Sequence, residues 1–75
     1  MKGQITHEGI ARALKKIRVE HQLTQQELSE ILYCDVRQIR RYETEGTDKI
    51  TVVNMYAEHF NINSLSILGM AQGAF

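Results

Sequence analysis

The sequence predicts one compact all-α domain over residues 1–75, with five helices and a core of about residues 6–69. In several segments apolar residues recur three and four positions apart, which is the spacing of one helix face. No proline interrupts the chain, and two helix-starting signatures follow each other closely between residues 24 and 38. Only residues 50–53 have the composition typical of a strand, and we expect this run to lead from a loop into a helix.

The first helix is expected from a cap at Thr6 to about His21. Its apolar stripe has four members at helical spacing, Ile10, Ala13, Leu14 and Ile17. After it, Leu23 is expected to fill the core. The buried side of the second helix is then expected to consist of Leu28, Ile31 and Leu32.

Two capping motifs define the second and third helices. Thr24 and Glu27 have the spacing of a capping box, in which each side chain accepts a hydrogen bond from the other residue's backbone N–H. Asp35 and Gln38 repeat this spacing, which leaves residues 33–34 as the turn. Two short helices joined by a tight turn predict a helix-turn-helix unit, whose second helix can enter the DNA major groove.

The last two helices follow a polar loop at residues 47–50. We expect Thr51 to cap the fourth helix and Ser64 to cap a short fifth helix. The apolar residues of the fourth helix are Val53, Tyr56, Ala57 and Phe60. The fifth helix has more apolar surface than so short a helix can bury.

A motif extends through the second and third helices. It begins Leu23-Thr24-Gln25-Gln26-Glu27-Leu28 and continues with Leu32, Ile39, Tyr42-Glu43 and Gly46, ahead of a helix that contains Ala57 and Phe60. With this motif the chain resembles the lambda-repressor-like (Cro/C1, XRE) family of DNA-binding domains over about residues 10–68. Two residues depart from the family pattern, since Ser29 replaces the usual alanine and Tyr33 replaces a turn glycine. Because that turn favours positive φ, we expect strain at Tyr33 or an altered turn.

Four residues of the third helix, Val36, Arg37, Arg40 and Arg41, are the candidates for base contacts. An arginine fork can bond O6 and N7 of guanine in the major groove, and it can also bond a phosphate. The alternative is a solvated helix face with pairs such as Arg41 with Glu45. Placement after a capped helix and a tight turn favours DNA contact.

Phosphate contacts are expected from the start of the second helix and from the loop after the third, at Thr24, Gln25, Gln26, Thr47 and Lys49. The family resemblance implies that Gln25 bonds the DNA backbone. It also implies a structural ion pair between Arg18 and Glu43, which would tie the first helix to the third.

Composition excludes several classes of function. Nine basic residues balance nine acidic ones, so attraction to phosphate depends on local clusters such as residues 37–41. The single cysteine, Cys34, and three scattered histidines suggest no metal site, and no catalytic constellation is present. No apolar stretch is long enough for a membrane span. We expect a cytoplasmic protein that is not an enzyme and has no cofactor.

The function expected from these features is sequence-specific binding of double-stranded DNA by a homodimer at a palindromic operator, and the resemblance implies a repressor, plausibly of its own operon. The candidate dimer interface is Leu65, Ile67, Leu68, Met70 and Phe75. Of these, we expect Leu65 and Leu68 to pack against the first helix, and Ile67 and Met70 to be available to a partner. The alternative function is an antitoxin or accessory module that uses the same fold to bind a protein.

Overall fold

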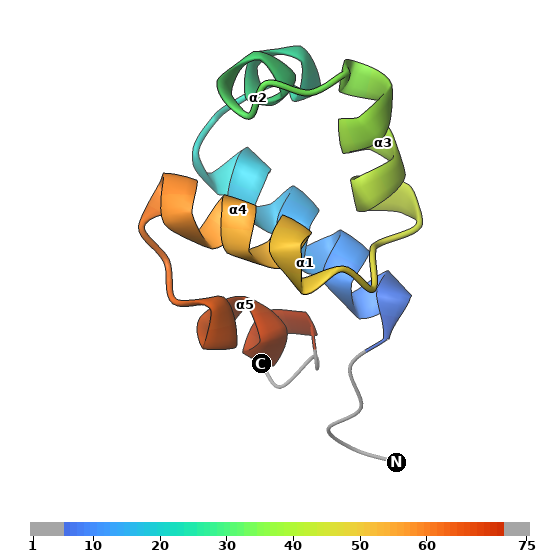
Figure 1. Ribbon diagram of the computed structural model, residues 1–75, viewed down its shortest axis with the longest axis vertical. Helices are drawn as coiled ribbons and strands as arrows, with labels where there is room; N and C mark the ends of the chain where they lie inside the picture. The colour runs from blue at the N-terminus through green and yellow to red at the C-terminus, as the bar shows by residue number, and fades with distance from the viewer. Residues whose placement is uncertain (1–5, 72–75) are drawn as a thin grey trace.

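Five α-helices account for most of residues 6–71, the part of the chain that the computed structural model describes (Figure 1). They are α1 (His7–Glu20), α2 (Gln25–Ile31), α3 (Val36–Thr44), α4 (Ile50–Phe60) and α5 (Ser64–Ala71). No strand occurs within this range, so the expected all-α class is confirmed for it. Helix α1 packs against both α3 and α5, and α2 packs against α3.

Helix α1 begins and ends where the sequence predicts. The Thr6 hydroxyl accepts from the backbone N–H of Gly9 at 3.0 Å, and the helix ends at Glu20 with His21 as its C-cap. The expected apolar stripe is buried. The small residues Gly9 and Ala11 of this helix are also buried. An added Cβ on Gly9 would collide with the Ala71 carbonyl at the end of α5.

The segment from Thr24 to Asp35 holds α2 and the turn into α3. The Thr24 hydroxyl accepts from the Glu27 N–H at 3.0 Å, and the Glu27 carboxylate accepts from the Thr24 N–H at 2.8 Å, so the capping box is confirmed. The Cys34 N–H donates to the Ser29 carbonyl at 3.0 Å and closes the turn. Tyr33 has φ of +58°, as its place in the turn predicts, and its side chain is 95% exposed.

Helix α3 is capped by Asp35, whose side chain accepts from the Arg37 N–H at 2.8 Å. The returning hydrogen bond expected from the Gln38 side chain is not formed within the described range. After the helix, Gly46 has φ of +75°, and an added Cβ there would collide with the His7 carbonyl. The chain therefore needs glycine at this position, both for the backbone conformation and for the close approach of the loop to α1.

The caps predicted for the last two helices are wrong by one or two residues. Helix α4 begins at Ile50, before Thr51, and its N-cap Lys49 makes no side-chain capping bond. For α5, the Asn63 side chain accepts from the Leu65 N–H at 2.8 Å, so Asn63 takes the role expected of Ser64. The Ser64 hydroxyl instead donates to Asn54 Oδ1 at 2.9 Å.

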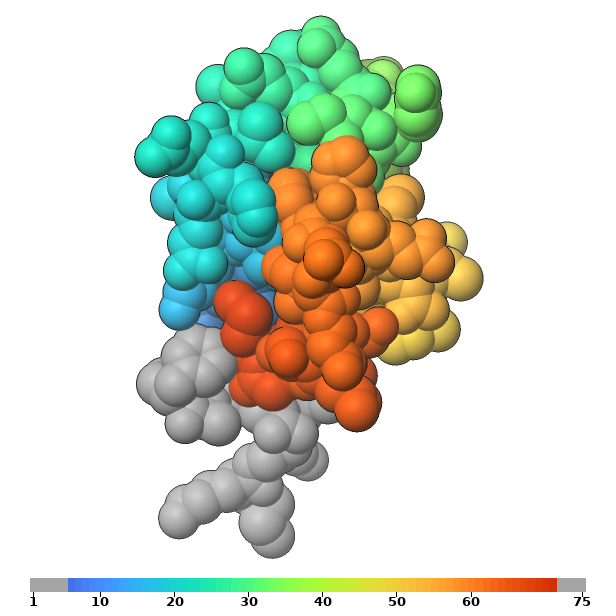
Figure 2. Space-filling model, turned by 90° about the vertical axis from the view of Figure 1, so that its left-hand side faces the viewer, coloured from blue at the N-terminus to red at the C-terminus, as the bar shows by residue number. Residues whose placement is uncertain are grey.

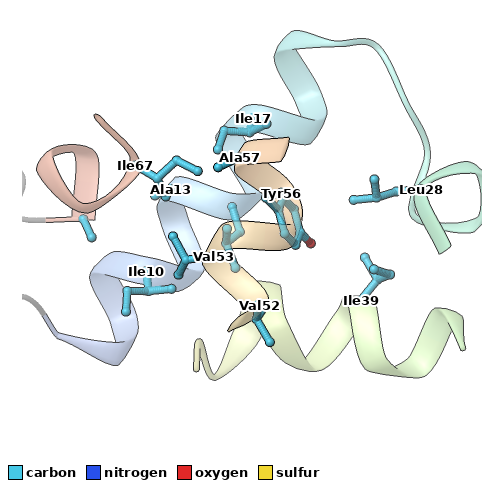
Figure 3. Close-up of a cluster of buried hydrophobic side chains, with 12 residues drawn as sticks. Ile10, Ala13, Ile17, Leu28, Ile39, Val52, Val53, Tyr56, Ala57 and Ile67 are labelled. Atoms are coloured by element: carbon cyan, nitrogen blue, oxygen red, sulfur yellow. The ribbon is translucent and has the colours of Figure 1, made fainter. Parts of the chain in front are cut away.

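The core lies between α1, α4 and α5 and extends beneath α2 and α3 (Figure 3). Its fully buried large side chains are Leu14, Ile17, Leu28, Ile39, Val53, Tyr56 and Ile67. The Tyr56 side chain points from α4 toward Leu28 of α2 and Ile39 of α3 (Figure 3). Its buried hydroxyl has no hydrogen-bond partner in the described part of the chain. Ile31 and Leu32, expected in the core, are only half-buried.

Helix α5 presents a different face to solvent from the one predicted. Ile67 is 0% exposed and belongs to the core, whereas Leu65 is 73% exposed. Leu68 and Met70 are half-buried, and Phe75 lies outside the described residues. Because α1 already covers Ile67, this residue is not available to a partner, and Leu65 replaces it as the exposed apolar side chain of the helix.

Candidate nucleic-acid interface

The candidate interface begins with the outer face of α3. Ile39 is fully buried and Tyr42 half-buried, so they fix which side of the helix faces the core. Arg37, Arg40 and Arg41 are exposed on the other side, and Val36 is half-buried at the start of the helix. Three guanidinium groups therefore share one exposed face of a helix of nine residues.

The three arginines differ in their surroundings. Arg37 Nε lies 3.6 Å from Asp35 Oδ1, and Arg41 Nη2 lies 3.7 Å from Glu45 Oε1. These pairs are long and largely exposed, so each contributes little stability. The guanidinium of Arg40 has no ion pair or hydrogen bond within residues 6–71. Arg40 is thus the cation of this face that is most available to an external anion or acceptor.

Asp35 completes the electrostatics at the start of α3. The hydrogen bond from the Arg37 backbone N–H lowers the pKa of this carboxyl, and the charges of Arg37 and Arg40 act in the same direction. Asp35 is therefore a carboxylate at neutral pH. It caps α3, but it also offsets part of the positive charge at the start of this helix.

A buried network connects α1, α2 and α3 beside this face. Arg18 Nε donates to Glu43 Oε2 at 2.6 Å, and Nη2 donates to Oε1 at 3.0 Å. Nη1 of Arg18 donates to the Leu23 carbonyl at 2.7 Å. The Arg18 and Glu43 side chains are 12% and 3% exposed, so the ion pair implied by the family resemblance is present and is shielded from water. The hydrogen bond to Glu43 raises the pKa of Arg18 further, so the guanidinium stays charged.

Gln25 extends this network toward solvent from the first position of α2. Its Nε2 donates to Glu43 Oε1 at 3.1 Å, which fixes the side chain over the ion pair. A primary amide has two N–H donors, and this bond uses one of them. The second N–H remains for an acceptor outside the protein. No local pattern indicates this contact, because Gln25 and Glu43 lie 18 residues apart in the sequence.

The other two candidates at the start of α2 already have partners. The Thr24 hydroxyl accepts the capping bond, and Gln26 Nε2 donates to Glu30 Oε2 at 3.2 Å. Both residues are exposed. The Thr24 backbone N–H is also used, by the Glu27 carboxylate, so the side-chain donors left for a phosphate are the Thr24 hydroxyl and the second N–H of the Gln26 amide.

Residues of the loop after α3 line a polar hollow of about 330 Å³, which Gln38 and Arg41 of α3 also line. Within it, the Thr47 hydroxyl accepts from the Lys49 N–H at 3.1 Å. The cations Arg41 and Lys49 line this hollow together with the acids Glu45 and Asp48. The positive charge of the rim is therefore largely offset, which makes Thr47 and Lys49 weaker anion contacts than the α3 face.

Gln38 is a residue whose place in this interface the sequence did not indicate. It is half-buried, and it lines both the hollow beside Arg41 and a second one formed with Asp35, Arg37 and Arg41. Its spacing from Asp35 predicted a capping role, and its place beside Arg37 and Arg41 was not predicted. A side-chain amide there can bond base edges as well as phosphates.

The cysteine and the histidines are the other residues that could carry chemistry. Within residues 6–71 no three histidine, cysteine or acidic side chains gather where a metal could be held. Cys34 is half-buried, and burial raises the pKa of its thiol. His21 Nδ1 lies 2.8 Å from the Ile17 carbonyl and its ring packs against Phe60, which is a structural role. No helix of the described chain has the length and apolarity needed to cross a membrane.

No protein-family model, curated protein or solved structure matches this chain. The likeness to lambda-repressor-like domains therefore depends on the motif residues themselves.

Proposed function

We propose that this protein is a sequence-specific regulator that binds double-stranded DNA, with α2 and α3 as a helix-turn-helix and α3 as the recognition helix. The observation that carries the proposal is the exposed face of α3, where Arg37, Arg40 and Arg41 lie together and the Arg40 guanidinium has no ion pair or hydrogen bond within the described residues. An α-helix fits the major groove of B-DNA, and arginine is the side chain most often bound to guanine there.

The roles of the four α3 residues follow from their positions. Arg37 and Arg40 would bond base edges, Val36 would contact the groove near the start of the helix, and Arg41 would bond either a base or a phosphate. The long pairs from Arg37 to Asp35 and from Arg41 to Glu45 can open at small cost, because both lie in solvent.

The phosphate contacts would fix the orientation of the helix in the groove. Gln25 is the best placed of them, since Glu43 already holds its amide and one N–H is unused. Thr24 and Gln26 would add contacts at the same strand, and Thr47 and Lys49 at the other side of α3. Such contacts give affinity without sequence specificity.

The regulatory part of the proposal is repression in the cytoplasm, plausibly of the protein's own operon, and it comes from the family resemblance. One recognition helix reads too few base pairs to select a site in a genome, so two copies on a palindromic operator would be required. Binding of a protein partner, as in an antitoxin, is the competing function and is separated by the test below.

The test is selection of bound fragments from random DNA, followed by affinity measurements across a salt series. The proposal expects one enriched motif with two-fold symmetry, and a linear fall of log affinity with log salt. Each phosphate that a lysine or arginine neutralises adds about −0.9 to this slope. A flat salt dependence together with no enriched motif would reject DNA recognition and favour the protein-binding function.

A further inference from the structure

Asp35 and Arg37 form an exposed pair at the start of α3, with side chains that are 59% and 80% exposed. The Asp35 oxygen Oδ1 accepts the capping hydrogen bond from the Arg37 backbone N–H at 2.8 Å. The same oxygen lies 3.6 Å from Nε of the Arg37 side chain, which is an ion-pair distance and too long for a hydrogen bond. The cap therefore holds the carboxylate beside the guanidinium of the residue that it caps.

Arg37 is the arginine of α3 that points most directly away from the core. Successive residues of an α-helix are rotated by about 100°, so Arg37 lies about 200° from Ile39, nearly opposite to it. Ile39 is 0% exposed and marks the direction of the core. Arg40 and Arg41 lie to either side of Arg37 on the helix. Figure 2 shows the turn before α3, in green, at one end of the long axis and away from α5.

The atom by which Arg37 approaches Asp35 decides what the side chain can still bind. Nε carries one of the five guanidinium N–H donors, and the two terminal nitrogens carry the other four. The terminal nitrogens form the fork that can bond O6 and N7 of a guanine. A contact through Nε therefore leaves the fork free, and this pair need not open when Arg37 binds a base.

The exposed pair at the other end of α3 has the opposite arrangement. Arg41 approaches Glu45 through Nη2, one of its terminal nitrogens, at 3.7 Å. A bidentate contact to guanine through this fork would need the same nitrogen, so Glu45 competes with a base for Arg41. Asp35 does not compete in this way for Arg37. The two pairs are otherwise alike, since both are long and exposed.

We propose that Asp35 is a positioning residue for DNA recognition, whose carboxylate holds the Arg37 guanidinium at Nε so that its free fork reads one guanine of the operator. The inference rests on the proposed function, because the role of Asp35 exists only on bound DNA. In water the pair contributes little, but exclusion of water at the DNA surface strengthens the attraction between the two charges. An arginine held in this way is not free to turn toward a phosphate.

The same carboxylate has a cost for binding to DNA in general. Its negative charge repels the phosphates of every sequence. Only a guanine within reach of the Arg37 fork returns a favourable contact that offsets this repulsion. Specificity is the difference between two affinities, and a repulsive charge that the correct base compensates increases that difference. Asp35 should thus increase discrimination between bases while it weakens binding to random DNA.

The test uses Asp35→Asn, which removes the charge and keeps the cap, because asparagine and aspartate are equally good N-cap residues. Affinity is measured for the selected operator, for variants with each base at each position, and for random DNA. Arg37→Ala identifies the position that Arg37 reads. Asp35→Asn should lower the guanine preference at that position by about fivefold and raise affinity for random DNA by about twofold. Combined with Arg37→Ala, it should cause no further loss of preference.

Two comparisons separate this role from capping. Asp35→Ser also keeps a capping side chain and should have the same effects on DNA binding as Asp35→Asn, while urea denaturation should show nearly unchanged stability for both. Glu45→Gln removes the acid of the other exposed pair. It should raise affinity for all sequences and leave the preference at the Arg37 position unchanged.

The outcomes distinguish the inference from the proposed function. If the wild-type protein selects a site but Asp35→Asn keeps its full guanine preference, Asp35 does not position Arg37, and DNA recognition by α3 still holds. A preference lost at a different position would mean that Asp35 itself contacts a base, such as N4 of cytosine, and would also overturn the role. If Arg37→Ala relaxes no position, Arg37 reads no base and the inference fails. A wild-type protein that selects no site would reject the proposed function and this inference together.

Discussion

Arg18 of α1 and Glu43 of α3 form a two-point ion pair, with donor–acceptor distances of 2.6 Å and 3.0 Å, beneath the start of α2. Arg18 also donates to the Leu23 carbonyl, and Glu43 also accepts from the Gln25 amide. One carboxylate thus connects three helices. A satisfied buried pair contributes less than its Coulomb energy suggests, but removal of one partner leaves the other charge buried and unpaired.

Glu43→Gln should therefore destabilise the domain strongly. The amide keeps the shape of the side chain but leaves the Arg18 charge uncompensated, and we expect a loss of about 3 kcal/mol in the free energy of unfolding. Urea denaturation followed by circular dichroism measures it. Glu45→Gln, at the C-cap of the same helix, is the matched control, since Glu45 is exposed and its pair with Arg41 is 3.7 Å long, and it should change stability by less than about 0.5 kcal/mol. Equal losses in the two variants would mean that the buried pair has no special role.

Tyr33→Gly should stabilise the domain by about 1 kcal/mol. Tyr33 has φ of +58°, a backbone conformation that costs free energy for a residue with a Cβ but not for glycine. Its ring is 95% exposed, so little packing is lost when the ring is removed. Thermal denaturation measures the change. Tyr33→Ala is the control, because it removes the ring and keeps the Cβ, and it should leave stability nearly unchanged. If both substitutions lowered the melting temperature, the ring would contribute to stability.

Tyr56→Phe should stabilise the domain by about 1 kcal/mol, because it removes a buried hydroxyl that has no hydrogen-bond partner within the described chain and keeps the ring. Chemical denaturation at neutral pH measures the difference. Tyr42→Phe is a suitable comparison, since this half-buried tyrosine lies at the edge of the same region and its hydroxyl can reach water. A loss of stability in Tyr56→Phe would reveal a bridging water or another partner for the hydroxyl.

The same residue predicts a dependence of stability on alkaline pH. Burial raises the pKa of the Tyr56 hydroxyl far above its usual value of 10.0, and the Glu43 charge adds to the effect. Above pH 10 the unfolded chain loses this proton and the folded chain keeps it, so stability is complete below pH 10 and falls as pH rises. Between pH 10 and 11 the contribution of Tyr56 should fall by about 1 kcal/mol. Wild type minus Tyr56→Phe isolates this slope, and a constant difference from pH 8 to 11 would contradict it.

Local signals explain which parts of the fold were predictable. The caps at Thr6, Thr24 and Asp35 depend on residues two or three positions away, and each is present. At α5 the cap was expected at Ser64, but Asn63 before it accepts the capping bond; both residue types favour the N-cap position, so composition alone does not separate them.

Contacts between helices explain the features that the sequence pattern did not predict correctly. Helix α5 is apolar around most of its circumference, so its pattern has no periodicity that says which side is buried. The contact of Ala71 with Gly9 sets that orientation and buries Ile67 instead of Leu65. The exposed arginines of α3 were predictable because Ile39 and Tyr42 fix the phase of the helix, whereas the bond from Gln25 to Glu43 joins helices distant in sequence.

Arg40 should contribute base specificity. Its guanidinium is exposed, and no ion pair or hydrogen bond of this group in the described structure has to break before it binds a base. Arg40→Ala is expected to weaken binding to the selected site by about 1 to 3 kcal/mol and to relax the preference at one base position, with little change in binding to random DNA. Competition binding with sites that carry each base at each position measures both effects. Lys49→Ala is the comparison, since a phosphate contact would weaken binding to all sequences equally and make the salt slope shallower by about 1. If Arg40→Ala lowered affinity for selected and random DNA by the same factor, Arg40 would be a backbone contact, and base recognition would have to come from Arg37 and its neighbours Val36 and Gln38.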